Sequence, residues 1–295
     1  MDIVTHAAIG LVIAGAFIDR PEMALALLAG SVAPDLDVLS RLLGKRAMLL
    51  CHQTFSHSIP ILTATSLLLG MVPAFGMPVA LGFGLGSLLH VLMDYTNTLG
   101  VTLLWPFVGR RMQVGWVFFV DAFVIAVSCI AATTTFLWFQ QHITPSVPIA
   151  FVMAILFILY WTCKALLLKR ARMTTGEGTV SILPSAWLPW QFYICSRHGQ
   201  EVMVDLLDLR TGLRKQLSAH SIMDEQVSSV LQPLPEWQLM RGLSPAYHAI
   251  KSETVGEEQR ISCRDLRVRN FNSTFGDLDI FVNAQGTVTQ TIFHV

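Results

Sequence analysis

The chain has 295 residues, of which 53% are hydrophobic and only 14% are charged, and its mean hydropathy is +0.55. Soluble domains carry about 25% charged residues, so this composition indicates a protein that is partly embedded in a membrane. The formal net charge of zero gives no indication of a nucleic-acid partner. Five scattered cysteines without a CxxC motif are typical of a reducing compartment and not of a disulfide framework.

Apolar runs dominate the first half of the chain. In chain order they are residues 7–18, 23–33, 59–73, 79–93, 118–140 and 147–168. The first two are only about a dozen residues long, whereas a full span needs roughly 20, so we expect them to form a short helical hairpin. The start of the chain lacks a basic region and a small-residue cleavage site, so we expect no removable signal peptide. We predict a mainly α-helical, polytopic membrane bundle of about four to six apolar helices, the first two short, over residues 1–173.

Small residues are concentrated in the run at residues 79–93. Gly82, Gly84, Gly86 and Ser87 follow one another at short intervals. Small side chains let two membrane helices approach closely, so we expect another helix to pack against this one.

The composition changes after Thr174. Alternating apolar and polar residues predict strands at residues 191–196, 201–209, 261–270, 277–283 and 287–294. We predict that residues 174–295 form a small soluble α+β domain.

The number of crossings predicts the topology. If every apolar run crosses the membrane, then His6, Asp35, Asp94 and Asp121 all lie at the same face. That face also collects most of the basic residues, while the opposite face has only Arg20; the basic residues are Arg41, Lys45, Arg46, Arg110, Arg111, Lys169, Arg170 and Arg172. The positive-inside rule makes this face cytoplasmic. We interpret Arg110 and Arg111 as determinants of topology, with binding of anionic headgroups as the alternative.

The polar segments between the apolar runs carry seven candidate metal ligands: His6, Asp35, Asp37, His52, His57, His90 and Asp94. His90 and Asp94 are spaced i, i+4 and share one helix face. Asp35 and Asp37 flank a leucine in a segment that we expect to be extended. Mixed imidazole and carboxylate ligands suit Zn²⁺, with Mn²⁺ or Fe²⁺ as alternatives. Seven ligands exceed the three of a mononuclear catalytic zinc site, so we expect two or three divalent ions that hold a catalytic water.

Each of these residues alone also has a structural explanation. A buried histidine is often a satisfied core residue, and His90 with Asp94 could form a hydrogen bond along a helix. Asp35 and Asp37 could cap helix ends. For Asp121 we favour a helix N-cap over an eighth ligand. Convergence of all seven candidates on one face favours the metal site, because ionisable groups in membrane helices are costly and usually functional. We expect neighbouring polar residues to hydrogen-bond the ligands, namely Thr54, Ser56, Ser58 and Asn97.

The motifs resemble one family. They are Thr5-His6, Gly30-Ser31 with Pro34-Asp35-Leu36-Asp37, His52 to Ser58, Ser87-Leu88-Leu89-His90 with Asp94, and Gly100 with Leu103 to Phe107. Over roughly residues 1–170 the chain resembles the bacterial LexA-regulated inner-membrane family of metal-dependent hydrolases, and more distantly the helical zinc phospholipase C and nuclease site. The resemblance implies that the seven candidates are metal ligands. The pattern after His52 usually continues with arginine, where this sequence has Gln53.

We therefore expect a hydrolase of the bacterial inner membrane with its active site and C-terminal domain in the cytoplasm. The membrane location and the metal favour a phosphodiester or lipid-type substrate. The expected partners are therefore membrane lipids and a small-molecule or lipid substrate. The alternatives are a metal transporter or sensor, and a membrane tether whose cytosolic domain binds a partner. The sequence indicates no oligomeric state.

Overall fold

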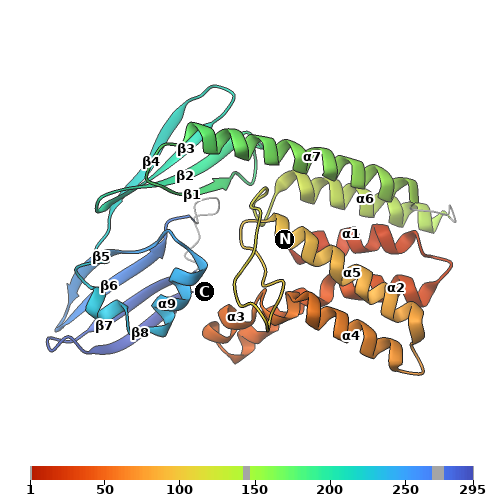
Figure 1. The fold of residues 1–295 in the computed structure, drawn as a ribbon, viewed down its shortest axis with the longest axis horizontal. Coiled ribbons are helices and arrows are strands. Elements are labelled where there is room, and N and C mark those ends of the chain that lie inside the picture. The colour runs from red at the N-terminus through yellow and green to blue at the C-terminus, as the bar shows by residue number, and fades with distance from the viewer. Residues whose placement is uncertain (1, 142–146, 268–275, 295) are drawn as a thin grey trace. The chain divides into compact units, whose positions relative to one another are not determined.

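A computed structural model describes residues 2–141, 147–267 and 276–294 (Figure 1). The chain forms two compact units, Met1–Ala165 and Leu166–Val295, which divide inside helix α7 (Val147–Thr174). The sequence-based boundary after residue 173 lies close to the end of the same helix. The three residues 268–270 of the predicted strand at 261–270 lie outside the described residues.

The first unit is helical. Its elements in chain order are α1 (Ile3–Gly15), α2 (Pro21–Val32), the 3₁₀ helix η1 (Ala33–Leu43), α3 (Lys45–Cys51), the 3₁₀ turn η2 (Phe55–His57), α4 (Ile59–Met71), α5 (Gly76–Thr96), α6 (Ala122–Gln140) and α7. Within the described residues, four segments are long and apolar enough to cross a membrane: Pro21–Leu43, Gly76–Thr96, Ala122–Gln140 and Val147–Thr174. The helices α1 and α4 are apolar but shorter. The predicted number of four to six apolar helices is confirmed, but the second helix is not short as predicted, because α2 continues into η1 and the two form one candidate span of 23 residues.

Aspartate caps determine where two of these helices begin. The Asp2 side chain accepts a hydrogen bond from the Thr5 amide at the start of α1. Asp121 accepts from the amides of Phe123 and Val124, so α6 begins four residues later than the predicted apolar run at 118–140. Such a cap satisfies amides that the first helical turn leaves without a partner. Asp121 is therefore a helix cap, as the sequence analysis favoured.

We expected the segment that carries Asp35 and Asp37 to be extended. It instead forms the 3₁₀ helix η1 directly after α2. Pro34 is tolerated there because the first turn of a helix needs no amide donor. A 3₁₀ helix turns by about 120° per residue, so side chains two positions apart point in different directions. In an extended segment the two carboxylates would instead share one side. Asp35 and Asp37 therefore face different nitrogens of the same ring, Nε2 and Nδ1 of His57 respectively.

Close packing of α2 against α5 brings the ends of these helices together (Figure 1). A Cβ atom on Gly82 or Gly86 would overlap the backbone of α2, at Met23 and Leu27 respectively. A Cβ atom on Gly30 of α2 would in turn overlap the backbone of Phe83. The prediction of a close helix contact along residues 79–93 is confirmed. The backbones approach closely because glycines lie at these contact points.

The connection between α5 and α6 folds back over the polar end of the bundle. A β-bridge joins Val101 to Met112, and the Trp116 amide donates to the Thr96 carbonyl. The Thr102 amide donates to the carbonyl of Gln53. These hydrogen bonds hold the connection against the segment between α3 and α4.

The second unit contains two four-stranded antiparallel sheets. The first has the order β1 (Thr179–Pro184), β2 (Gln191–His198), β3 (Glu201–Asp208), β4 (Arg214–Ser221), and the second has the order β5 (Tyr247–Val255), β6 (Glu258–Asp265), β7 (Asp277–Val282), β8 (Val288–His294). Between them lie two short helices, α8 (Ser228–Leu231) and α9 (Pro235–Leu243). The predicted α+β class therefore needs correction, because this domain is antiparallel β with two short helices. Its buried core includes Cys195, Val204 and Leu266.

Candidate metal centre

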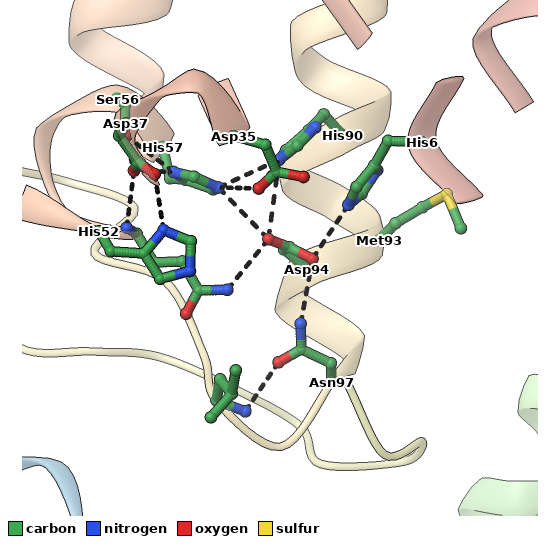
Figure 2. Close-up of polar contacts among 12 residues, drawn as sticks. His6, Asp35, Asp37, His52, Ser56, His57, His90, Met93, Asp94 and Asn97 are labelled. Atoms are coloured by element: carbon green, nitrogen blue, oxygen red, sulfur yellow. Dashed lines mark hydrogen bonds and ion pairs between the residues drawn. The ribbon is translucent and has the colours of Figure 1, made fainter. Parts of the chain in front are cut away.

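Four of the seven predicted ligands form one buried cluster. Asp35 comes from η1, His57 from η2, and His90 and Asp94 from the last turns of α5. One ligand atom from each lies within 4.8 Å of all the others, and all four residues are buried. Figure 2 shows the two carboxylates and the two imidazoles turned toward one another. The shared helix face predicted for His90 and Asp94 is confirmed.

The spacing of the cluster fits a small divalent ion. His57 Nε2 lies 3.0 Å from His90 Nε2, 3.6 Å from Asp35 Oδ1 and 3.3 Å from Asp94 Oδ2. His90 Nε2 lies 3.5 Å from Asp35 Oδ1 and 3.7 Å from Asp94 Oδ2. Ligands held about 2.1 Å from a tetrahedral zinc ion lie about 3.4 Å from one another. The observed separations are scattered around that value.

Hydrogen bonds at the far side of each imidazole determine which nitrogen faces the cluster. His90 Nδ1 lies 2.8 Å from the Ser31 carbonyl oxygen, which can only accept, so Nδ1 carries the proton. His57 Nδ1 lies 3.0 Å from Ser56 Oγ and 3.4 Å from Asp37 Oδ2. Both Nε2 atoms then present lone pairs to the cluster, as metal-binding histidines do.

Asp37 and His52 lie one layer further from the centre. His52 Nδ1 is 2.6 Å from Asp37 Oδ1, and Ser56 Oγ donates to Asp37 Oδ2. The backbone amide of Gln53 donates to the same Oδ2 atom over 2.8 Å. With these partners and His57, Asp37 orients an imidazole of the cluster and is not one of its four members. The structure therefore does not bring Asp37 and His52 into the cluster.

His6 adjoins the cluster through Asp94. His6 Nε2 is 3.2 Å from Asp94 Oδ1, and its ring stacks on that of His90 with centroids 3.6 Å apart. Asn97 Nδ2 donates to the same Oδ1 atom over 3.0 Å. Of the predicted supporting residues, Asn97 and Ser56 therefore contact the ligands or their partners. Ser58 instead donates to the Trp105 carbonyl, and Thr54 to the carbonyl of His52.

Two residues of the site were not predicted. Gln53 is buried, its φ of 59° lies in the left-handed region, and its Nε2 donates to Asp94 Oδ2 over 3.3 Å. This backbone conformation costs of order 1 kcal/mol for a residue other than glycine and is common at functional sites. Arg111 Nη1 donates to Gln53 Oε1 over 3.1 Å, and Nη2 to the His52 carbonyl over 2.7 Å. Nothing in the sequence relates Arg111 to residues 58 positions earlier.

A cation fits the buried donors of the cluster. Asp35 Oδ2 is buried and accepts no hydrogen bond within the described part of the chain. The Nε2 lone pairs of His57 and His90 face each other at 3.0 Å, which is repulsive unless a positive charge lies between them. Two carboxylates with two neutral imidazoles carry a charge of −2, which one divalent cation neutralises. Mixed nitrogen and oxygen donors suit zinc and similar transition metals better than calcium.

A separate polar contact links α6 to α7. The Tyr160 hydroxyl lies 2.9 Å from both Asp121 oxygens, and Lys164 Nζ is 4.0 Å from Asp121 Oδ2. These interactions explain why Asp121 and Lys164 are buried within apolar helices. They also show Asp121 bound to residues outside the cluster.

Comparisons with known proteins identify the family. The chain is 31% identical over 140 residues to the uncharacterized protein YfhP of Bacillus subtilis (strain 168), an alignment that covers 42% of this chain and 43% of that protein. The chain thus matches less than half of this relative's length, and no solved structure matches. A family model described as YdjM inner membrane protein matches residues 1–169, and this is the LexA-regulated family that the motifs resemble. With more than half of its length matched, the chain belongs to the YdjM inner membrane protein family.

Proposed function

We propose that this protein is a membrane-embedded, metal-dependent hydrolase that acts on a phosphodiester or lipid-type substrate. The observation that carries the proposal is the buried cluster of Asp35, His57, His90 and Asp94 at the ends of apolar helices. Burying two carboxylates away from water is strongly unfavourable unless a positive charge compensates them. Burial of the cluster therefore costs free energy that a structural role alone does not explain.

The four residues of the cluster would hold a divalent cation, with zinc favoured. Such a cation supplies a Lewis acid that polarises a phosphoryl or carbonyl oxygen and lowers the pKa of water. The number of ions stays a prediction; a single four-residue cluster is the size of one site.

The surrounding residues hold the ligands in place. Ser31 fixes the His90 ring through its carbonyl, while Asp37 and Ser56 fix the His57 ring. Asn97 and His6 hold the Asp94 carboxylate from its other oxygen. Ligands that are fixed in this way need no rearrangement when the substrate reacts.

The location of the reaction follows from the predicted topology. The basic residues near the cluster-bearing ends of the helices favour the cytoplasmic leaflet of the inner membrane. Substrates at that leaflet, including the headgroups of membrane lipids, would reach the cluster without crossing the bilayer.

Metal analysis of the purified protein tests the proposal. We expect at least one equivalent of a transition metal in the wild type, and its loss in His90→Ala and Asp35→Asn. The controls His198→Ala and Asp19→Asn alter exposed residues and should retain the metal. Hydrolysis of bis(p-nitrophenyl) phosphate should disappear with the metal. Metal that stays bound in both cluster variants contradicts the assignment, and metal-dependent uptake without hydrolysis favours a transporter.

A further inference from the structure

The guanidinium of Arg111 is fixed beside the cluster by two uncharged acceptors. It donates to the side-chain oxygen of Gln53 and to the carbonyl of His52. The side-chain amide nitrogen of Gln53, Nε2, in turn donates to Asp94. One amide group therefore connects the guanidinium to a member of the cluster.

In the part of the chain that the structure describes, this positive charge has no carboxylate partner at close range. Among the described residues, no carboxylate oxygen lies within the 4.0 Å limit of an ion pair with Arg111. Three arginines of the β unit differ, since Arg214, Arg260 and Arg267 lie 2.6, 2.6 and 2.9 Å from aspartate oxygens. Burial lowers the pKa of Arg111 to about 10, although Asp37 opposes this shift, so the side chain remains protonated at neutral pH.

Arg111 also retains donors for a ligand. A guanidinium has five N–H groups in a planar fork, and the two hydrogen bonds to Gln53 and His52 use two of them. The remaining geometry suits two oxygens of one tetrahedral anion. The neighbouring Arg110 is exposed, whereas Arg111 is half-buried.

We propose that Arg111 is the anion-binding residue of this site and that the substrate carries a phosphate group, which Arg111 holds next to the cluster. This inference rests on the proposed hydrolase function and narrows its substrate to phosphate esters, in place of neutral esters. Gln53 is a positioning residue, because it fixes the guanidinium relative to Asp94. The phosphate could belong to a lipid headgroup or to a soluble phosphodiester.

Phosphate binding can be measured without turnover. Inorganic phosphate and soluble dihexanoyl-phosphatidylglycerol are titrated by calorimetry into detergent-solubilised, zinc-loaded protein. We expect Arg111→Met to weaken phosphate binding at least tenfold, Arg111→Lys to weaken it less, and Arg110→Met to leave it unchanged. The metal content of all three variants should equal that of the wild type. Tighter binding of phosphatidylglycerol than of phosphate would identify the lipid source, and the reverse order the soluble one.

The outcomes separate this inference from the proposed function. If the wild type binds metal but its phosphate affinity is the same in Arg111→Met, or if it binds no phosphate, the role of Arg111 is overturned and the metal site stands. If phosphate binding depends on Arg111 but the wild type holds no metal, the anion site stands and the hydrolase proposal fails.

Discussion

In the C-terminal unit, strand carboxylates lie against arginines, whereas in the helical unit the carboxylates of the cluster lie against imidazoles. Asp205 is 2.6 Å from Arg214 and Asp279 is 2.6 Å from Arg260, so each negative charge meets a permanent positive one. Asp35 instead lies 3.6 and 3.5 Å from His57 and His90, which bring no charge when neutral. The β unit balances its charges internally. Under the proposed function, the cluster of the helical unit takes its cation from outside the protein.

Of the changes that test this difference between the two units, removal of the cation should have the largest effect on stability. If the cluster binds a metal present at a thousand times its Kd, chelation should lower the free energy of unfolding of the helical unit by about 4 kcal/mol. The β sheets, which contribute no residue to the cluster, should be unaffected. Hydrogen–deuterium exchange measures both in one sample, through peptides from α5 and from β2. Equal loss of protection in both peptides would contradict the comparison.

The contact between Asp121 and Lys164 sharpens the comparison, because here the helical unit does use an internal cation. Lys164→Met should destabilise the protein by about 3 kcal/mol, since it leaves a buried carboxylate without its lysine. The double variant Asp121→Asn with Lys164→Met should recover to within about 1 kcal/mol of the wild type. Unfolding in sodium dodecyl sulfate gives the free energies. Lys169→Met, at an exposed position of the same helix, is the control, and metal content should not change in any variant.

A smaller effect is expected at Asp224 in the β unit. Burial would raise the pKa of Asp224, but hydrogen bonds from His248 and the Ala249 amide lower it overall. A lowered pKa in the folded state means that its contribution to stability is present above pH 4 and is lost as the pH falls through the folded value. Asp224→Asn should cost about 1 kcal/mol at pH 7 and flatten this acid dependence. Urea unfolding followed by exchange in β5 peptides between pH 2.5 and 7 tests it. The exposed neighbour variant Glu225→Gln should keep the wild-type pH profile.

Local patterns predicted much of the site. The i, i+4 spacing of His90 and Asp94 depends only on helix geometry, so it was readable from the sequence. The conformation of the segment with Asp35 and Asp37 was not, because an apolar run that ends in proline permits both an extended strand and a 3₁₀ continuation. That difference decides why Asp35 reaches the cluster and Asp37 does not. The position of Arg111 beside the cluster was not predicted, because it depends on how a long connection folds, which no periodicity records.

The β unit shows the same limit. Strands β2 and β3 were predicted from the alternation of apolar and polar residues, and in β2 the buried Phe192 and Ile194 alternate with the half-buried Gln191 and Tyr193. Strand β4 (Arg214–Ser221) is largely exposed on both faces and so has no alternation to detect. The stretch between residues 210 and 260, where no strand was predicted, contains β4, β5 and only two short helices, so the domain is antiparallel β and not α+β.

The contact between the backbones of α2 and α5 has a consequence for ion selectivity. Because a Cβ atom on Gly82 or Gly86 would overlap the backbone of α2, these glycines set the spacing between α5, which carries His90, and α2, which leads directly into the segment of Asp35. Calcium needs six to eight oxygens at about 2.3–2.6 Å, which four rigid donors, two of them nitrogen, do not supply. The glycines that let the two helices touch would thereby also contribute to the selectivity of the site for the metal ion.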